Sequence, residues 1–418
     1  MTDTQVLITG GGIGGIGAAL MLGRRGIRVT VLEREPELTE GGFGLQLGPN
    51  ITRMLRSEGV FDRIAPLMVF PKRLAFRNAI TGQFLNYLDC DDMERRYGSR
   101  YAVMHRNDLL QALATGARET GNVTILNSAK VVDFADHGDH VSVETDTGVR
   151  LTGQVLLAAD GIHSLVRRRW VGDEVVPTGY VAYRGALPED RVSPDFDFSD
   201  LTLWMGPGLH FIQYGLRDGH ELNQVAVFRS PAYARGEQDW GGTEELFERF
   251  AGTYSPVFEG MQGLSMVRGW PMVDREPLDS YARGRVALLG DAAHATLQYL
   301  AQGAGQSLLD GSSLARHLSA LSDSDVWADD AVAAAFAAYE ADRIEQASRV
   351  QRTSRFWGEM WHVDTTGAVM LRDHLFSTVD RYDYSLIDWL YGPVAEDEDG
   401  AAGRSATQDG TTTERTPA

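Results

Sequence analysis

The glycine-rich stretch QVLITGGGIGGIGAALMLGRRGIRVTVLERE, residues 5–35, is the feature that most constrains the fold of this chain. It predicts an apolar strand, a glycine turn, an apolar helix and a second apolar strand. Gly10, Gly12 and Gly15 occupy the positions of the G-x-G-x-x-G fingerprint. The first glycine permits a tight turn, the second lets backbone approach a pyrophosphate, and the third allows close contact between helix and strand.

Glu33 ends the second strand, where a carboxylate can bind the hydroxyls of a ribose. The start of the helix adds free N–H groups and a positive dipole end for phosphates. Glycine turns also serve ordinary packing of a strand–helix–strand unit. Because strand, helix and terminal acid are all in register, we interpret the stretch as a dinucleotide site. These residues alone leave open whether the dinucleotide is NAD or FAD.

Composition sets broad limits on size and partners. The 418 residues, 43% of them hydrophobic, are ample for two or three domains. The formal charge of −19, from 39 basic and 58 acidic side chains, argues against nucleic acid or an anionic membrane as partner. An anionic small substrate therefore needs local positive charge to bind. Cys90 is the single cysteine, and no secretory leader or membrane-inserting run is evident, so we expect a cytoplasmic protein.

Two later stretches repeat the pattern of an apolar strand followed by an acidic turn. VLLAADGIHSLVRRR, residues 155–169, has Asp160 and Gly161 after the strand, then the basic run 167–169. GRVALLGDAAHATLQYLAQGAGQSLLDG, residues 284–311, has Gly290 and Asp291 in the same place. Either aspartate alone is more commonly a helix cap. A third element, VMHRNDLLQAL, contains Arg106.

Together these motifs resemble the single-component FAD-dependent aromatic hydroxylases, a family of flavoprotein monooxygenases. The resemblance implies that Asp291 contacts the flavin ribose, that Asp160 lies near FAD and the nicotinamide cofactor, and that Arg106 lies at the flavin. It implies FAD as cofactor, with NADH or NADPH as co-substrate. We expect no metal site. The candidate cofactor-binding residues are Gly10, Gly12, Gly15, Glu33, Arg34, Gln46, Arg106, Val131, Asp160, Gly290 and Asp291.

Further stretches, including YVAYRGALP, HFIQYGLRDG and WGEMWHVD, resemble the branch of 3-hydroxybenzoate 6-hydroxylases and salicylate hydroxylases. The resemblance runs from about residue 5 to residue 391. Two departures concern the pocket. The family often has proline after the Asp-Ala-Ala-His run, where this chain has Ala295 and Thr296, and its later acidic pair reads Leu309-Asp310 here.

The predicted fold class is α/β, with a Rossmann-like FAD-binding domain, a mixed β-sheet substrate domain and C-terminal helices. We assign residues 1–73, 99–175 and 278–355 to the FAD-binding domain. Residues 74–98 and 176–277, rich in alternating strand patterns, form the substrate domain. Residues 356–392 are expected to be a helical segment. The acidic, then Gly-, Ser- and Thr-rich tail 393–418 is expected to be disordered.

Three residues are candidates for the chemistry of hydroxylation. In the strand pattern GLHFIQYGL, His210, Ile212 and Tyr214 share one face. A ring attacks an electrophilic oxygen best as a phenolate, so a base beside the phenol favours the reaction, and His210 is the candidate base. Tyr214 orients the ring or its carboxylate, and Gln298, by resemblance, completes the polar wall. The structural alternative is a hydrogen-bonded pair between neighbouring strands.

The resemblance implies a function in which reduced flavin and O2 form a flavin 4a-hydroperoxide that hydroxylates a phenolic aromatic acid. The preferred reaction is 3-hydroxybenzoate to gentisate, with NADH or NADPH, in a protein that we expect to be a homodimer. A salicylate or hydroxynicotinate hydroxylase shares every motif above. A flavin-dependent halogenase is disfavoured because no Trp-x-Trp-x-Ile-Pro stretch is present. A flavin oxidoreductase or flavin-binding protein that hydroxylates nothing stays open.

Overall fold

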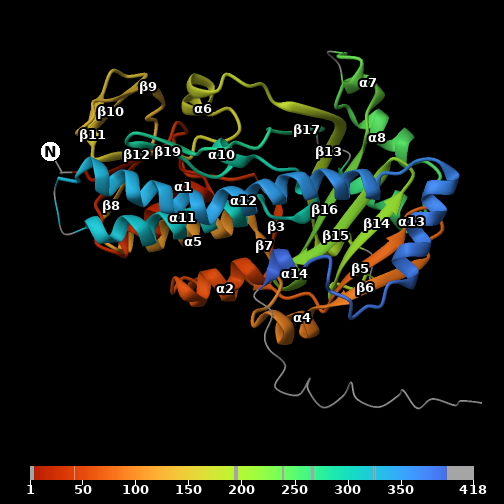
Figure 1. The fold of residues 1–418 in the computed structure, drawn as a ribbon. Helices are drawn as coiled ribbons and strands as arrows, with labels where there is room; N and C mark the ends of the chain where they lie inside the picture. The colour runs from red at the N-terminus through yellow and green to blue at the C-terminus, as the bar shows by residue number, and fades with distance from the viewer. Residues whose placement is uncertain are drawn as a thin grey trace, which may run out of the picture.

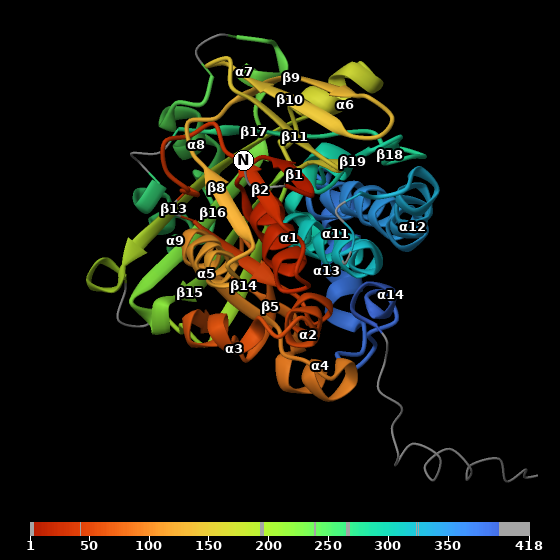
Figure 2. The same ribbon diagram turned by 90° about the vertical axis from the view of Figure 1, so that its left-hand side faces the viewer.

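The computed structural model describes residues 4–41, 43–192, 196–237, 240–264, 268–322, 324 and 326–392. Two sheets lie side by side, and helices α1, α5, α11 and α12 cover the first of them (Figures 1 and 2). This arrangement confirms the predicted α/β class, with a Rossmann-like domain, a mixed second sheet and C-terminal helices. The predicted disordered tail, residues 393–418, lies outside the described residues.

The first sheet has the strand order β18-β19-β12-β1-β2-β8. Its five longer strands are parallel and β18 is antiparallel at the edge. Continuous apolar runs form β1, β2 and β12 because a parallel sheet is buried on both faces. The strand bounds are β1 Val6–Thr9, β2 Val29–Leu32, β8 Val123–Leu126, β12 Val155–Ala158, β18 Ala282–Arg283 and β19 Val286–Leu288.

Small residues let the covering helices approach closely. Helix α1, Ile13–Gly23, packs between α5, Arg106–Glu119, and α11, Gly303–Leu318. A Cβ atom on Gly17 would lie 2.3 Å from a methyl of Leu308, and one on Gly311 would lie 2.9 Å from the backbone of Ala18. Glycine at these positions is therefore required by helix packing.

The second sheet is mixed and has the strand order β17-β13-β16-β15-β14-β5-β6. Only the pairing of β14 with β5 is parallel among these neighbours. The hairpin of β5 and β6 joins the sheet from a distant part of the chain. The bounds are β5 Arg73–Asn78, β6 Phe84–Asp89, β13 Val176–Pro188, β14 Asp200–Gly206, β15 Leu209–Leu216, β16 Glu221–Arg229 and β17 Trp270–Asp274.

The two faces of this sheet pack against different parts of the molecule. Leu209 and Phe211 of β15 face a core closed by α8, Thr243–Phe250, and α9, Ser255–Gly260. Ile212 and Tyr214 face the opposite core, which includes side chains of α12. The predicted alternation of side chains along β15 is confirmed, and it determines which of these side chains face the first sheet.

The remaining elements connect these layers. Short antiparallel sheets are formed by β9–β11 and by β3, β7 and β4. Their bounds are β3 Gly44–Leu47, β4 Met68–Val69, β7 Ala102–His105, β9 Val131–Asp136, β10 Val141–Thr145 and β11 Arg150–Gly153. The other α-helices are α2 Pro49–Ser57, α3 Phe61–Ile64, α4 Cys90–Tyr97, α6 Leu165–Trp170, α7 Pro231–Ala234, α10 Asp291–His294, α13 Thr366–Thr378 and α14 Asp388–Tyr391. The 3-10 turns are η1 Ala65–Leu67, η2 Glu189–Arg191, η3 Arg217–Gly219, η4 Met261–Leu264, η5 Gln298–Leu300 and η6 Ser319–Leu321.

Helix α12, Asp329–Trp361, runs past both sheets as one continuous element (Figure 1). Its Tyr339 hydroxyl donates to the carbonyl of Leu288 in β19 at 2.9 Å. Further along, Arg355 pairs with Asp274 of β17 at 2.7 Å. The helix therefore continues through position 355, where we placed the end of the FAD-binding domain, and the domain limits stay a prediction.

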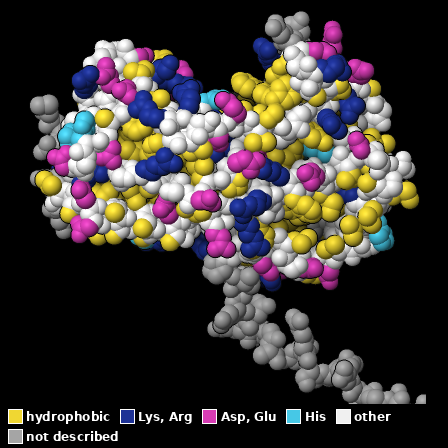
Figure 3. All heavy atoms as spheres, turned by 45° about the horizontal axis from the view of Figure 1, so that its top comes forward, with side chains coloured by type: hydrophobic (Ala, Val, Ile, Leu, Met, Phe, Trp, Pro, Cys, Tyr) yellow, Lys and Arg dark blue, Asp and Glu magenta, His cyan; other side chains and the backbone are white. Residues whose placement is uncertain are grey.

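None of the described helices is both long enough and apolar enough to cross a bilayer. On the face drawn in Figure 3, basic and acidic side chains are interspersed. A notch on this face separates the lobe that carries β9–β11 and α6 from the lobe that carries α7 and α8.

A test of the glycine turn is the pair of substitutions Gly15→Ala and Gly367→Ala, both inside helices. A Cβ on Gly15 would lie 2.0 Å from the carbonyl oxygen of Gly10, whereas one on Gly367 meets nothing within 4 Å. We expect Gly15→Ala to destabilise the protein by about 1–3 kcal/mol through overpacking. Gly367→Ala should be neutral or stabilise by up to about 1 kcal/mol through helix propensity. Denaturant unfolding measures both, and equal stability of the two variants would contradict the close contact.

Candidate functional site

A cavity of about 680 Å³ lies between the carboxyl ends of the first sheet and the inner face of the second. Ligands of open α/β sheets bind at this edge. Among the described residues, Gly15 and His210 are the predicted site residues that do not line it. Those that do are Gly10, Gly12, Glu33, Arg34, Gln46, Arg106, Val131, Asp160, Tyr214, Gly290, Asp291 and Gln298.

The glycine turn after β1 forms one wall of the cavity. Gly10 has φ +101°, and a Cβ there would lie 2.3 Å from the carbonyl oxygen of Ala159. A Cβ on Gly12 would meet nothing nearer than Glu40 Oε1 at 3.5 Å, so the Gly12 backbone faces open space. No side chain caps the start of α1 at Gly12. The turn therefore leaves helix N–H groups free for a phosphate.

Glu33 lies beside this turn at the end of β2. One of its carboxylate oxygens accepts from the amide of Gly11 at 2.5 Å, and the other accepts from the amide of Glu35 at 2.9 Å. The neighbouring Arg34 is exposed and pairs with Glu35 at 3.1 Å. An anchored carboxylate next to a phosphate-sized cradle fits the ribose of a dinucleotide.

Two acidic turns form the opposite wall. Asp160 follows β12; one carboxylate oxygen accepts from the amide of Leu165 at 2.7 Å, while the other is buried without a partner among the described residues. Burial raises the pKa of Asp160. Asp291, by contrast, is exposed to the cavity at the start of α10. Gly290 before it has φ +61°, and a Cβ there would lie 2.7 Å from the Ser307 hydroxyl.

A buried carboxylate holds the second acidic turn, and the sequence did not reveal this role. Asp310 of α11 accepts from the amide of Gly290 at 2.8 Å, from His294 at 2.6 Å and from Arg343 at 2.8 Å. Burial alone would raise the pKa of Asp310, but His294 and Arg343 outweigh it and lower that pKa. Asp310, which we noted only as part of the pair Leu309-Asp310, is thus an ionised anchor of the turn.

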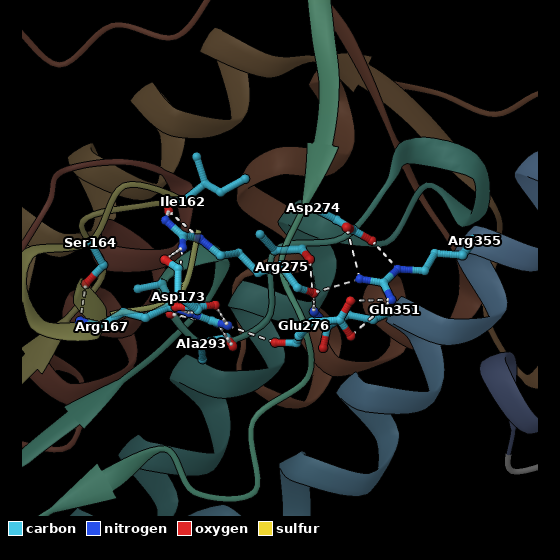
Figure 4. A network of polar contacts seen from close by, with 12 residues as sticks. Ile162, Ser164, Arg167, Asp173, Asp274, Arg275, Glu276, Ala293, Gln351 and Arg355 are labelled. Atoms are coloured by element: carbon cyan, nitrogen blue, oxygen red, sulfur yellow. Dashed lines mark hydrogen bonds and ion pairs between the residues drawn. The ribbon is translucent and has the colours of Figure 1, made fainter. Parts of the chain in front are cut away.

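Arg167, the first residue of the predicted basic run, links the two acidic turns (Figure 4). Its fully buried guanidinium pairs with Asp173 at 2.7 Å and donates to the carbonyl of Ala293 in α10, also at 2.7 Å. Arg275 donates to the carbonyl of Ile162, in the turn that carries Asp160, at 2.7 Å. These arginines therefore bind protein groups and fix the spacing of the turns.

The inner end of the cavity is built on the register of β13, β16 and β15. Arg184 lies opposite Val225, which lies opposite Ile212, so these three side chains form one row across the sheet. Tyr214, opposite Asn223, stands in the next row. All but Asn223 line the cavity, giving it a wall of two apolar and two polar side chains.

Polar groups meet at this inner end. Arg184 donates to the amide oxygen of Gln298 at 2.6 Å, while the Gln298 amide nitrogen is buried without a partner among the described residues. Tyr214 is 2% exposed, and burial raises its pKa, so its hydroxyl is a neutral donor and acceptor. A Cβ on Gly44 would lie 2.6 Å from the Tyr214 ring. The absence of a side chain at Gly44 of β3 therefore leaves the space that the Tyr214 ring occupies.

Gln46 and Arg106 stand between the two ends. Gln46 accepts a hydrogen bond from the Tyr101 hydroxyl at 2.5 Å. Arg106 pairs with Glu40 at 2.8 Å. Both line the cavity, so a dinucleotide lying along it passes them.

His210 lies one row beyond Ile212, opposite Val227, and is fully buried. Its Nδ1 is 2.6 Å from Nε2 of His362, and the two rings stack with centroids 4.9 Å apart. The rings of Tyr299 and Trp361 cover it edge-on. Burial lowers its pKa to about 3, and its Nε2 has no partner among the described residues. His362, the residue that follows α12, was not among our predicted residues.

The residues present fit an FAD molecule. The open cradle at Gly12 suits a pyrophosphate, Glu33 and Asp291 suit ribose hydroxyls, and the unpartnered Asp160 oxygen offers a buried acceptor. Beyond them the wall of Arg184, Ile212, Tyr214 and Gln298 leaves space for a small ring. A cavity of this size and mixed lining is typical of a cofactor site.

Comparison with known proteins agrees with this geometry. The sequence matches the family described as FAD binding domain over residues 3–188 and 237–354. It is 34% identical to the 3-hydroxybenzoate 6-hydroxylase of Polaromonas naphthalenivorans (strain CJ2), over 93% of this chain and 96% of that protein. It is 32% identical to the 3-amino-4-hydroxybenzoate 2-monooxygenase of Streptomyces cremeus, over 94% and 96%.

Among solved structures, a salicylate hydroxylase substrate complex superimposes with a TM-score of 0.74 and 25% identity, covering 93% of this chain and 95% of that one. Sequence, fold and cavity therefore agree on cofactor and class. The chain belongs to the FAD-binding family of flavoprotein aromatic monooxygenases.

Proposed function

We propose that this protein hydroxylates a phenolic aromatic acid with O2 and NADH or NADPH, and that its substrate is 3-hydroxybenzoate, which it converts to gentisate. The observation that carries the proposal is the inner end of the cavity. There Arg184, Tyr214 and Gln298 offer polar contacts beside the apolar Ile212 and Val225. The similarity to 3-hydroxybenzoate 6-hydroxylase over nearly the whole chain supports the choice of substrate.

The FAD is held by residues along the outer cavity. The Gly10–Gly12 turn binds the pyrophosphate, Glu33 and Asp291 bind ribose hydroxyls, and Arg106 and Gln46 border the flavin. Gly15 acts indirectly, by keeping the turn against α1. When bound and reduced by the nicotinamide co-substrate, FAD supplies the activated oxygen of which one atom is transferred to the ring.

The aromatic ring would lie at the inner end of the cavity, against the inner face of the second sheet. Ile212 and Val225 exclude water from its face, while Tyr214 and Gln298 hydrogen-bond its substituents. The unpartnered Gln298 amide nitrogen is an available donor, and the neutral Tyr214 hydroxyl both donates and accepts. These contacts fix which ring carbon faces the oxygen, and such positioning contributes strongly to rate.

His210 acts as the base for the phenol in this proposal. Burial lowers its pKa to about 3, which keeps the ring neutral and makes it a weak base, and its Nε2 has no partner among the described residues. With Nδ1 donating to His362, the tautomer that leaves Nε2 bare is available. A phenolate forming beside it raises the pKa of the histidine. The step requires side chains around His210 to move, because His210 is fully buried and does not line the cavity.

The direct test uses purified FAD-loaded protein with a panel of hydroxybenzoates and 6-hydroxynicotinate. We expect 3-hydroxybenzoate to accelerate NADH oxidation and to give gentisate in near-equal amount to the NADH consumed. Catechol from salicylate, or a hydroxylated pyridine, as the main product would assign one of the rival activities. A protein in which no phenolic acid accelerates NADH oxidation is a flavin-binding protein without this activity.

We also propose that the protein acts in the cytoplasm as a homodimer. Exposed apolar side chains of α13 and the end of α12 offer an association surface, including Phe356, Met370 and Leu371. Light scattering after gel filtration measures the mass directly.

The variant His210→Ala separates the catalytic and structural roles of the histidine. If His210 is the base, its loss should slow hydroxylation on the order of 10²–10⁴-fold. Oxygen that is reduced without transfer to the ring should leave as hydrogen peroxide. The readout is product per NADH consumed, beside thermal melting, with the exposed His220→Ala as matched control. Lower stability with unchanged coupling would show that His210 only pairs with His362.

The variant Asp291→Ala tests the cofactor role of the second acidic turn. A carboxylate bound to hydroxyls contributes roughly 1.5–3 kcal/mol, so the FAD dissociation constant should rise about tenfold or more. Fluorescence titration of the apoprotein with FAD measures it, and the exposed Asp139→Ala is the control. An unchanged constant for Asp291→Ala would contradict the ribose contact.

A further inference from the structure

Arg184, which is half-buried, differs in its partners from the buried arginines of the described chain. It stands on the inner face of β13, lines the cavity, and has no carboxylate of the described chain within ion-pair distance. Every arginine that is buried in the described chain has such a carboxylate. These pairs are Arg167 and Arg275 with Asp173, Arg285 with Asp329, Arg343 with Asp310, and Arg372 with Asp373.

The hydrogen bond from Arg184 to Gln298 uses few of the N–H donors of the guanidinium. A guanidinium carries five N–H donors, and the structure shows one of its nitrogens bound to the Gln298 amide oxygen at 2.6 Å. That contact turns the Gln298 amide nitrogen away as a further donor, buried and without a partner among the described residues. The corner is therefore rich in N–H donors and lacks an anion to accept from them.

The charge of this corner is positive in an otherwise acidic protein. Burial lowers the pKa of Arg184, and the nearby Arg106 guanidinium lowers it further, yet an arginine stays protonated at neutral pH. Arg106 is already paired with Glu40, whereas Arg184 is not paired with an acid. Since the chain carries a formal charge of −19, this corner supplies local positive charge for an anionic ligand at the inner end of the cavity.

The neighbours of Arg184 define the shape of that anion. Val225 and Ile212 continue its row across the sheet and are apolar, so a ligand that reaches the guanidinium lies against hydrocarbon. Tyr214 stands in the next row with a neutral hydroxyl. A planar carboxylate on a flat ring matches both features, because a guanidinium binds carboxylates through two parallel N–H bonds.

We propose that Arg184 is the residue that binds the carboxylate of the aromatic acid and makes the enzyme prefer acids over neutral phenols. This assignment rests on the proposed function and adds the group that recognises the substrate class. Gln298 positions the guanidinium through its amide oxygen, and its free N–H serves the same anion or the neighbouring ring substituent.

The test compares benzoate with benzamide, a neutral ligand of similar shape, as probes for the FAD-loaded protein. Binding is followed through the change in flavin absorbance, which requires no turnover. We expect the wild type to bind benzoate at least tenfold more tightly than benzamide. In Arg184→Gln this preference should fall about tenfold or more, mainly through weaker benzoate binding. Arg184→Lys should restore part of it, since the charge returns without the planar fork.

The matched control is Arg169→Gln, which removes the same charge from an exposed site beside Asp133, outside the cavity. It should leave the benzoate preference unchanged. A preference that survives in Arg184→Gln overturns the proposal. If instead FAD affinity falls in both Arg184 variants while the benzoate preference is unchanged, Arg184 serves the cofactor and the proposal is wrong.

The same experiment separates this proposal from the proposed function. If the wild type forms gentisate from 3-hydroxybenzoate but Arg184→Gln keeps its anion preference, only the role of Arg184 fails. If the wild type hydroxylates no aromatic acid yet prefers benzoate through Arg184, the anion site stands and the reaction is wrong. A wild type with no preference for benzoate overturns the assignment of Arg184 directly.

Discussion

The site depends on one ion pair, between the fully buried Arg167 and the partly exposed Asp173. The two acidic turns follow the paired parallel strands β12 and β19, and beyond the ends of those strands they must stay at a fixed distance for one dinucleotide to bridge them. Arg167 connects them, because it binds the α10 backbone with one side of its guanidinium and Asp173 with the other. Asp173 also contacts Arg275, which binds the Ile162 carbonyl. Because Asp173 is partly exposed, its removal should cost less than the roughly 3–5 kcal/mol that is typical of a fully buried pair.

The second constraint is the register of the mixed sheet. Side chains on its inner face come in rows about 6.6 Å apart, so each row meets a different part of the molecule. The rows of Ile212 and Tyr214 meet the cavity, and the row of His210 meets the end of α12. A histidine two residues from a cavity residue thus lies in another environment. The reaction proposed for it depends on movement of side chains, whereas that of Tyr214 and Gln298 does not.

How much of the site could be predicted from the sequence depends on how far apart in the chain the interacting residues lie. The glycine turn, Glu33 and the acidic turns are set by neighbours in the chain, and the structure places all of them as local patterns predict. Asp310, Arg167 and His362 act through contacts that the fold creates. His362 meets His210 across 152 positions, and no periodicity links them. Arg184 was within a stretch that we quoted, but its lack of an acid partner is visible only once its surroundings are known.

Helix α12 has a consequence for the protein as a whole. Its 33 residues extend about 50 Å and bind the first sheet at Tyr339 and the second at Arg355. A hinge between the two sheets would have to bend this helix or detach it. Movement of one sheet against the other is therefore restrained, and we expect the two sheets to melt as a single cooperative unit rather than as independent domains.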